Sequence, residues 1–305
     1  MQNIPPCFFA LFLTNLICLH LSSAYNVLYQ VCNSDNNYAG NSAFSTNLEQ
    51  LSSSLSTEAV AKQGFYENNT IGTAPDQISG LVLCRGDVDS SICRDCLDQS
   101  FTDLSNQCPS SNEATIYYDF CLLSYSNQQF LNSTDNIAKI PNVPSTRFSG
   151  WDPSDDTVRN TFSTLVNTLL SNVSDQAAYK SRKHFGTGVI NITASLPVIY
   201  GLSQCVPDFS NITCRACLED LIYQMLKIFD GQQGGRFLGV RCNLRYDIYA
   251  FFYGNPDIQI GSISGTVLPT PRASGKGEYS TPDMASSIFH LKKKKSWNIF
   301  KFISS

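Results

Sequence analysis

The sequence of 305 residues is poor in the groups from which most catalytic and metal sites are built. It has three His, and charged residues make up 15% of the chain. His184 stands alone within the cysteine-rich part and no G-x-S-x-G motif occurs, so a hydrolase would lack its nucleophile and base. The formal net charge of −4 provides no basic field for nucleic acid. We therefore expect a protein that is not an enzyme and uses no cofactor, no metal and no nucleic acid.

Long apolar runs are scarce as well. The run from Cys7 to Leu21 is shorter than the 18 or so residues that a membrane span needs. Ser22-Ser23-Ala24 supplies the small residues of a cleavage site, although no Lys or Arg precedes the run. We expect residues 1–24 to be a secretory signal peptide and the mature chain to be extracellular. An uncleaved membrane anchor is the alternative interpretation.

Residues 255–305 differ in composition from the rest of the chain. Gly, Ser, Thr and Pro are frequent in the first half of this tail, which predicts a linker or a disordered segment. The end is basic and aromatic, with Lys292–Lys295 followed by Trp297, Phe300 and Phe302. Such an end could contact an anionic membrane surface, although a solvated tail is the simpler interpretation.

Cysteine, in contrast, is abundant, with twelve residues. Two leave with the expected signal peptide, and ten remain: Cys32, Cys84, Cys93, Cys96, Cys108, Cys121, Cys205, Cys214, Cys217 and Cys242. An even number in an exported protein predicts disulfides. The pattern C-x8-C-x2-C starts at Cys84 and again at Cys205, and Cys121 recurs as Cys242 at the same shift of 121 residues. Residues around the motif also match at this shift, which predicts a duplicated domain.

A helix pattern upstream of each motif repeats at a different shift. The first pattern is Phe44, Leu48, Leu51, Leu55 and Ala59, and the second, 114 residues later, is Val158, Phe162, Leu165, Leu169 and Val173. The second copy therefore holds about seven extra residues before its motif, which we expect around 174–183. Asp155 and Asp156 stand at the start of the second helix, where capping explains an acidic pair better than catalysis does.

The two copies differ by two cysteines. Cys32 corresponds to Thr146 at the helix shift, and Cys108 corresponds to Phe229 at the motif shift. Because the loss of one disulfide removes two cysteines together, we expect a Cys32–Cys108 pair. The C-x2-C step also occurs in zinc sites and thioredoxin-like redox sites, but no His is suitably placed and no βαβ pattern surrounds it. Disulfides are the better interpretation.

A further helix is expected in each copy, from Cys93 and from Cys214. Strand-like stretches flank these helices at 77–84, 115–120 and 122–130 in the first copy and at 198–205, 236–240 and 244–253 in the second. The fold class is therefore α+β, with two tandem small domains at 25–132 and 147–254. Each is expected to pack two helices on an antiparallel sheet of about five strands, stapled by disulfides.

The doubled C-x8-C-x2-C signature resembles the Gnk2-homologous domain, also called DUF26 or the salt stress response/antifungal domain. Cys32-Asn33, Gly234-Gly235-Arg236 and the segments 199–205 and 242–246 match as well, and the resemblance covers about residues 25–254. This family occurs in plant cysteine-rich repeat secretory proteins and in ectodomains of cysteine-rich receptor-like kinases. By position, the resemblance implies the disulfides Cys32–Cys108, Cys84–Cys93, Cys96–Cys121, Cys205–Cys214 and Cys217–Cys242.

The antifungal member of this family binds mannose through an Asn, an Arg and a Glu. Asn33 stands at the Asn position of the first copy, whereas Thr115 and Ser126 occupy the other two positions. In the second copy, Arg236 and Asp247 stand at the Arg and acid positions. The resemblance thus implies Asn33, Arg236 and Asp247 as candidate ligand-binding residues. A structural ion pair between Arg236 and Asp247 is the alternative.

Five N-x-S/T sequons are candidate glycan acceptors in an exported chain: Asn68, Asn132, Asn172, Asn191 and Asn211. The resemblance implies a secreted, apoplastic, non-enzymatic binding module in plant defence or stress signalling. Its expected partner is a cell-wall or fungal glycan, or another receptor ectodomain. The alternative is a truncated receptor-like kinase ectodomain that acts as a membrane-associated co-receptor or decoy.

Overall fold

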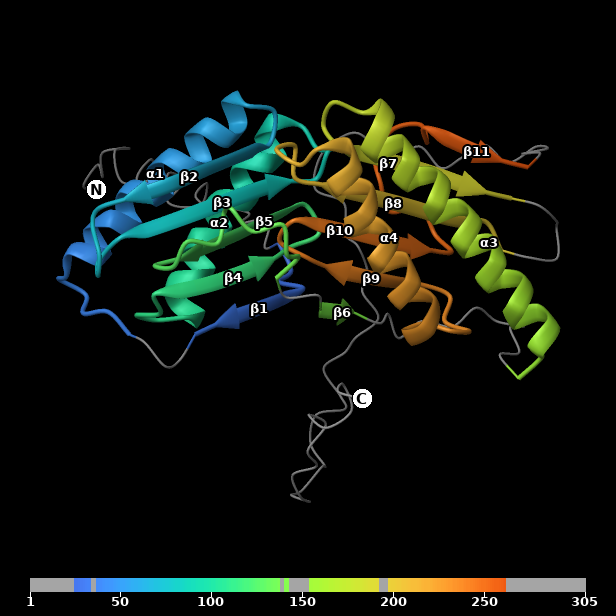
Figure 1. Ribbon diagram of the computed structural model, residues 1–305, viewed down its shortest axis with the longest axis horizontal. Helices are drawn as coiled ribbons and strands as arrows, with labels where there is room; N and C mark the ends of the chain where they lie inside the picture. Colours follow the sequence, from blue (N-terminus) through green and yellow to red (C-terminus); the bar gives the residue numbers. More distant parts are fainter. Residues whose placement is uncertain (1–24, 34–36, 138–139, 143–153, 192–196, 262–305) are drawn as a thin grey trace, which may run out of the picture. The chain divides into compact units, whose positions relative to one another are not determined.

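The computed structural model describes residues 25–33, 37–137, 140–142, 154–191 and 197–261. The expected signal peptide, residues 1–24, and the basic tail with Lys292–Lys295 lie outside the described residues. The described residues fall within one compact unit. They form two α+β domains, each with two helices against one sheet (Figure 1). The fold class expected from the sequence is confirmed.

The first domain has a five-stranded antiparallel sheet in the order β1-β4-β5-β3-β2. Its elements are β1 (Tyr29–Cys32), α1 (Ala43–Ala61), β2 (Phe65–Ile71), β3 (Ile78–Cys84), α2 (Ser90–Gln107), β4 (Glu113–Tyr117) and β5 (Cys121–Ser126). Helices α1 and α2 cover one face of this sheet (Figure 1). Leu51, Leu55 and Ala59 of α1 are fully buried against it, as the helical spacing predicts.

The second domain has a six-stranded sheet in the order β11-β7-β8-β10-β9-β6, antiparallel except for the pair β11 and β7. Its elements are β6 (Ile140–Asn142), α3 (Asp156–Asp175), β7 (Phe185–Ile190), β8 (Ile199–Cys205), α4 (Asn211–Ile228), β9 (Gly235–Leu238), β10 (Cys242–Asp247) and β11 (Ile258–Ile260). Helices α3 and α4 cover one face of this sheet (Figure 1).

Both edge strands of the second sheet lie outside the range 147–254. β6 is the counterpart of β1, because Tyr29 pairs with Tyr117 on β4 and Ile140 pairs with Leu238 on β9. The second domain thus takes its first strand from the segment that connects the two copies.

β11 falls where the sequence predicts a linker, and for residues 255–261 that prediction is wrong. The segment is held by Asp257, whose carboxylate accepts the backbone N–H of Thr187 at 2.9 Å and its hydroxyl at 3.1 Å. The N–H of Asn191 donates to the carbonyl of Ile260 at 2.9 Å. These bonds allow a three-residue strand to add in parallel to β7.

The extra residues of the second copy form a π-helical turn, Gln176–Lys180, that continues α3 directly. This turn buries Ala177 and Ala178 in the core of the second domain. A tight turn follows it, in which the N–H of His184 donates to the carbonyl of Ser181 at 3.2 Å. The expected insertion around 174–183 therefore lengthens α3 and ends in a turn just before β7.

Acidic residues cap two of the helices. The Asp155 carboxylate accepts the N–H groups of Thr157 and Val158 at the start of α3. Asp89 does the same for Ser91 and Ile92 at the start of α2. Capping therefore accounts for the acid at the start of α3. None of the described helices combines the length and the apolar character that a membrane crossing requires.

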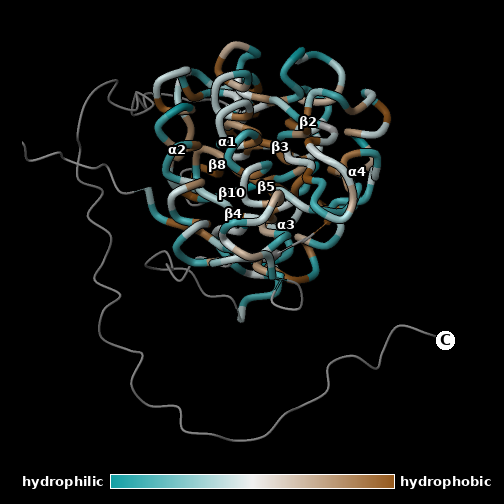
Figure 2. Tube along the Cα trace, turned by 90° about the vertical axis from the view of Figure 1, so that its left-hand side faces the viewer, coloured by the Kyte–Doolittle hydropathy of each residue, from teal (hydrophilic) through white to brown (hydrophobic). Residues whose placement is uncertain are grey.

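β3 is buried along its whole length, because both faces of the first sheet are covered. Ile78, Val82 and Cys84 belong to the core beneath α1 and α2. Leu81 and Leu83, which alternate with them, belong to the cluster that contains the core of the second domain. A strand covered on both faces has no polar alternation in its sequence. Figure 2 shows hydrophobic stretches of the chain among the strands, where this layer lies.

Five disulfides join the same pairs that the family resemblance implies. Cys32–Cys108 connects β1 to the end of α2. In the second domain Phe229 stands where Cys108 stands in the first, and its buried ring meets the Phe237 ring edge-on at 5.7 Å. Gly235 leaves room for this ring, since a Cβ there would lie 2.6 Å from Phe229. In the second domain, aromatic packing thus takes the place of one disulfide.

Candidate functional site

Asn33 lies at the end of β1, on the edge of the first sheet. Its backbone N–H donates to the Glu113 carbonyl at 3.0 Å, and its side-chain amide donates to the Glu113 carboxylate at 3.4 Å. The Ser111 hydroxyl donates to the Asn33 carbonyl at 2.8 Å. Asn33 and Glu113 are both half-buried. An amide and a carboxylate are thus presented together at the sheet edge.

Glu113 is a candidate site residue that the sequence does not predict. It lies opposite Ser126 in the register of β4 and β5, and Ser126 occupies the acid position of the family. The carboxylate therefore comes from the neighbouring strand. Thr115, at the Arg position, is buried and shares a hydrogen bond of 2.8 Å with Ser124. The strand predicted at 115–120 begins after Glu113, so only the observed register of β4 and β5 places this acid opposite Ser126.

Arg236 and Asp247 do not bind each other, so the alternative interpretation, an ion pair between them, is wrong. Arg236 lies on β9 directly opposite Arg245 on β10. Nη1 of Arg236 binds Asp119 at 2.8 Å, whereas Asp247 binds Nη2 of Arg245 at 3.1 Å. Asp119 belongs to the turn between β4 and β5. The partner of Arg236 therefore comes from the other copy of the domain.

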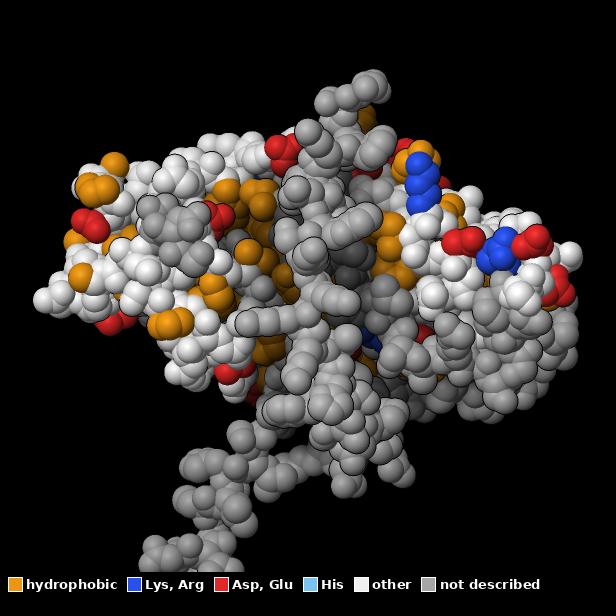
Figure 3. Space-filling view, turned by 90° about the horizontal axis from the view of Figure 1, so that it is seen from below, with side chains coloured by type: hydrophobic (Ala, Val, Ile, Leu, Met, Phe, Trp, Pro, Cys, Tyr) orange, Lys and Arg blue, Asp and Glu red, His pale blue; other side chains and the backbone are white. Residues whose placement is uncertain are grey.

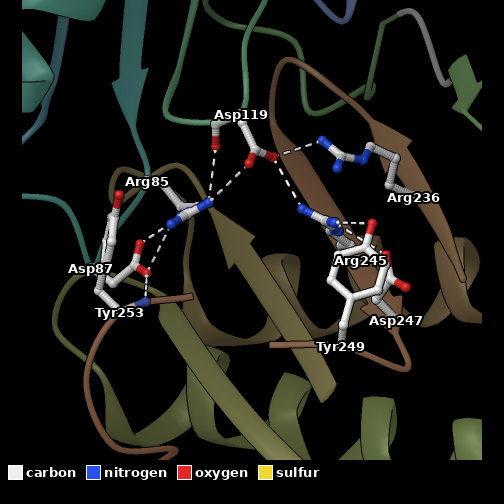
Figure 4. A network of polar contacts seen from close by, with 8 residues as sticks. All are labelled: Arg85, Asp87, Asp119, Arg236, Arg245, Asp247, Tyr249 and Tyr253. Carbon is white, nitrogen blue, oxygen red and sulfur yellow. Dashed lines mark hydrogen bonds and ion pairs between the residues drawn. The ribbon is translucent and has the colours of Figure 1, made fainter. Parts of the chain in front are cut away.

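Asp119 is the centre of a network that joins the two domains, and three guanidinium groups point at its carboxylate (Figure 4). Its Oδ1 lies 2.8 Å from Nη1 of Arg236 and 3.2 Å from Nη1 of Arg245. Its Oδ2 lies 3.6 Å from Nη1 of Arg85, which also donates to the Asp119 carbonyl at 3.3 Å. One acid of the first domain thus pairs with two arginines of the second.

The network continues beyond Asp119 on both sides (Figure 4). Asp87 binds Nε and Nη2 of Arg85 at 2.6 and 3.1 Å, and its Oδ2 accepts the backbone N–H of Tyr253 at 2.6 Å. On the other side, the Arg245 guanidinium lies 3.9 Å from the centroid of the Phe251 ring. The segment after β10 is therefore bound to the first domain by a backbone hydrogen bond as well.

Burial and charge act in opposite directions on the acids of this network. Burial alone would raise the pKa of Asp119, but Arg236, Arg245 and Arg85 outweigh it, so the pKa lies below its ordinary value. The pKa of Asp247 is raised, because burial outweighs its contacts with Arg245. Burial, and to a smaller extent the positive charge of Arg245, lower the pKa of the Arg236 guanidinium, while Asp119 raises it. Asp119 is consequently held as a carboxylate at neutral pH.

A cavity of about 60 Å³ lies beside the network and is lined by Asp119, Arg236 and Arg245 together with apolar side chains such as Leu122 and Leu202. One water molecule needs about 10–15 Å³ of such space, so the cavity has room for only a few waters. Pockets that enclose small molecules measure roughly 300–1,000 Å³. The arrangement is therefore suited to fastening the domains and not to enclosing a sugar.

A second group of charges crosses the interface at Arg241, which is 1% exposed. Its Nη1 lies 3.2 Å from Asp208 and 3.6 Å from Glu67 on β2 of the first domain. Its Nη2 donates to the carbonyls of Leu131 and Phe130. Burial, and to a smaller extent the negative charge of Asp208, raise the pKa of Glu67, while Arg241 lowers it. The domains are thus joined by two separate charged groups.

The described residues contain no group of three or more His, Cys, Asp or Glu placed to hold a metal ion. His184 is buried, and its Nδ1 has no hydrogen-bond partner among the described residues. An imidazole on its own gives neither a metal centre nor a nucleophile with its base.

The five sequon asparagines differ in exposure. Asn132, Asn172 and Asn211 are exposed, whereas Asn68 on β2 and Asn191 after β7 are half-buried. A glycan needs an acceptor amide that solvent reaches, so the three exposed residues are the better candidates. Glycosylation at all five stays a prediction.

Comparison with known proteins places this fold in a family. The family model described as salt stress response/antifungal matches residues 31–128 and 152–249. The chain is 37% identical to an antimicrobial ginkbilobin-2-like protein of Castanea crenata, over 79% of this chain and 95% of that protein. It is 36% identical to cysteine-rich repeat secretory protein 38 of Arabidopsis thaliana, over 73% of this chain and 85% of that one.

Another relative is much longer than this chain. Cysteine-rich receptor-like protein kinase 6 of Oryza sativa subsp. japonica is 34% identical over 73% of this chain, and the match spans 32% of the kinase. A solved structure, the tandem DUF26 ectodomain of the Arabidopsis thaliana cysteine-rich receptor-like protein PDLP8, shares the fold with a TM-score of 0.58 at 24% identity, over 73% of this chain and 97% of that one. The resemblance carried by the cysteine motifs is thus confirmed. The chain belongs to the salt stress response/antifungal family, also called the Gnk2-homologous or DUF26 family, and holds two copies of its domain.

Proposed function

We propose that this chain is a secreted, apoplastic binding module without catalytic activity, which acts in plant defence or stress signalling by recognising a glycan. The observation that carries the proposal is the pair of Asn33 and Glu113 at the edge of the first sheet. An amide beside a carboxylate offers a donor and acceptors to neighbouring sugar hydroxyls. The relatives support the setting, since one is named antimicrobial and another secretory.

The other two candidate residues have a different role in this proposal. The side chain of Arg236 is 15% exposed and that of Asp247 is 4% exposed, and both bind charged groups of the network. A ligand would have to displace these partners. We therefore assign Arg236 and Asp247 to holding the second domain against the first, and Asn33 to the ligand.

A glycan array tests the role of Asn33. We expect the mature chain to bind a neutral hexose glycan and Asn33→Ala to weaken this binding about tenfold, the loss of one or two hydrogen bonds. Glu113→Gln keeps the shape of the side chain and removes its charge, and should weaken binding as well. Asn160→Ala is the matched control, because Asn160 is exposed on α3 of the other domain. An array without any bound glycan, or equal binding by the two Asn variants, would contradict the proposal.

A second candidate function, binding to another ectodomain, is favoured by the surface around β1. β1 is an edge strand, and Tyr29 and Val31 on it are 45% and 40% exposed. Figure 3 shows several hydrophobic side chains to the left of the centre of the face seen from below. An edge with free backbone groups and apolar side chains can pair with a strand of a partner. Val31→Lys should then abolish capture by a receptor ectodomain and leave glycan binding unchanged.

An alternative role is that of a membrane-associated co-receptor or decoy, because receptor kinases are among the relatives. The chain spans about a third of the length of the kinase described above. Fractionation of the full chain against a version that ends at Gly261 tests this role, because that version retains β11. If both stay in the soluble fraction, the alternative fails.

A further inference from the structure

Two contiguous cavities of about 250 and 80 Å³ form a groove where the two domains meet. Both are lined by Gln63, Gly64, Cys84 and Lys183. The C-terminal ends of α1 and α3 lie at this same side of the molecule (Figure 1). The groove is separate from Asn33 and from the arginines of the second domain that bind Asp119, none of which lines it.

One wall of the groove is the turn between α1 and β2 in the first domain. Gln63 and Gly64 have positive φ angles of 61° and 102°, and the N–H of Gly64 donates to the Ala59 carbonyl at 2.7 Å. The N–H of Cys84 donates to the Gly64 carbonyl at 2.6 Å, and a Cβ on Gly64 would lie 3.2 Å from the Cys84 Cβ. The turn is therefore pressed against the Cys84–Cys93 disulfide and is fixed in place.

The opposite wall comes from the insertion that only the second copy contains. The turn from Ser181 to His184 is closed by a backbone hydrogen bond, and Nζ of Lys183 donates to the carbonyl of Gly86 in the first domain at 3.3 Å. Arg182 in the same turn lines the smaller cavity. A groove with both walls held in this way loses little conformational freedom when a ligand enters.

The groove gathers positive charge in a part of the chain that is acidic overall. Residues 1–254 contain 14 Lys and Arg against 22 Asp and Glu. Six of these arginines are in ion pairs: Arg85, Arg159, Arg215, Arg236, Arg241 and Arg245. Arg182 and Lys183 line the groove, and within the described part neither of them forms an ion pair. Lys62 lines the smaller cavity from the other wall.

Little negative charge offsets this group. The partner of Lys62 is Glu58 at 3.8 Å, with both side chains well exposed, which makes a weak ion pair. Asp89 is the one acid among the described residues that line the two cavities, and it already accepts the N–H groups of Ser91 and Ile92 as the cap of α2. The groove therefore has cations available for an anionic ligand.

We propose that this groove binds an acidic saccharide, an oligomer of uronic acid. The Arg182 guanidinium and the ammonium groups of Lys62 and Lys183 can donate charged hydrogen bonds to the carboxylates that repeat along such a chain. The Gln63 amide and the Ser90 hydroxyl, which line the cavities, match its hydroxyls. This inference rests on the proposed function, since it names one class of glycan, but it uses a site on other residues.

Titration calorimetry of the mature, disulfide-bonded chain with a trimer of galacturonic acid tests the inference. The control ligand is the same trimer as its methyl ester, which has no charge. We expect the acid to bind at least about tenfold more tightly than the ester, and its affinity to fall as salt is added. Arg182→Gln should weaken binding of the acid about fivefold, the effect of one charged contact near a surface.

Lys227→Gln is the matched control variant, because Lys227 is an exposed cation on α4 that lines neither cavity. Lys183→Gln is measured beside its melting temperature, since Lys183 also contacts Gly86. Equal affinity for acid and ester, no binding of the acid, or equal weakening by Arg182→Gln and Lys227→Gln would each overturn the inference. In each of these cases a neutral glycan whose binding is lost in Asn33→Ala would leave the proposed function standing.

Discussion

Asp119 shows, at the scale of a single residue, how the two copies of the domain depend on each other. Its carboxylate pairs with Arg85 of its own domain and with Arg236 and Arg245 of the other. Within the described part, Arg236 has no second ion pair. Arg236 and Arg245 lie opposite each other on β9 and β10. The Asp119 carboxylate between them offsets the repulsion between their two positive charges.

Replacing Asp119 by Asn removes the charge and keeps the shape. We expect the free energy of unfolding to fall by about 2–3 kcal/mol, less than for a fully buried pair, because the Asp119 side chain is 38% exposed. Urea denaturation measures this loss. Asp156→Asn is the control, since its exposed pair with Arg159 is expected to contribute under about 1 kcal/mol. Similar losses in both variants would refute a special role for Asp119.

The lowered pKa of Asp119 predicts a pH dependence. The folded-state value lies below the unfolded value of about 3.9, so Asp119 stabilises the fold above that pH and its contribution is lost as the pH falls through the folded pKa. Asp247 has a raised pKa and acts in the opposite direction, losing its contribution as the pH rises through that value. Below about pH 4 the stability of the wild type should fall more steeply than that of Asp119→Asn. Parallel curves from denaturation at several pH values would contradict this.

At the scale of elements, the structure follows the sequence where a pattern is long and departs from it where an element is short. Apolar spacing located α1 and α3, and the repeated motif located β3 and β8. β6 and β11 have three residues each, too few for any periodicity, and they become strands because β9 and β7 offer them an edge.

The residues of the candidate site also differ in how far the sequence predicts them. Asn33 could be named from its place after the first cysteine, because that position is local in the sequence. Glu113 needed the register of β4 and β5, and Asp119 lies 117 positions before its partner Arg236. No local pattern reports a contact between two duplicated domains, since their facing surfaces decide it.

Removal of β11 tests the contribution of this short element. A chain ending at Gly254 loses the strand and the Asp257 carboxylate that binds Thr187, which leaves one edge of β7 uncovered. We expect its melting temperature to fall by about 2–4 °C, as for a loss near 1 kcal/mol in a protein of this size. A chain ending at Gly261 keeps these contacts and should melt with the full-length protein. If the two truncated chains melt together, β11 contributes nothing measurable.

At the scale of the whole described molecule, the hydrophobic clusters do not stop at the boundary between the copies. Leu81, Leu83 and Leu122 of the first sheet belong to the cluster that contains the second core. The groups around Asp119 and Arg241 add charged contacts across the same boundary. Interfaces between domains of one chain are more often polar and allow relative motion. This interface is apolar and ion-paired, which favours one cooperative body.

Calorimetry can test that cooperativity. We expect a single transition whose calorimetric and van't Hoff enthalpies agree. Gly86→Ala places a Cβ against the Phe185 ring of the other domain, so it should lower the melting temperature and broaden or split the transition. Gly40→Ala is the matched control, because nothing lies within 4 Å of a Cβ there. Two separate transitions in the wild type would show that the domains unfold independently.

The shared carboxylate of Asp119 also bears on how such a gene can change. A recombination event that removed the first repeat would leave Arg236 without its ion-pair partner and Arg245 with Asp247 alone. One that removed the second would expose Leu81 and Leu83 to solvent. Neither half is then a ready-made ancestor to which the protein can revert. Because the two repeats share charges and apolar surface, deleting either one would destabilise the other, so the duplication is not easily reversed.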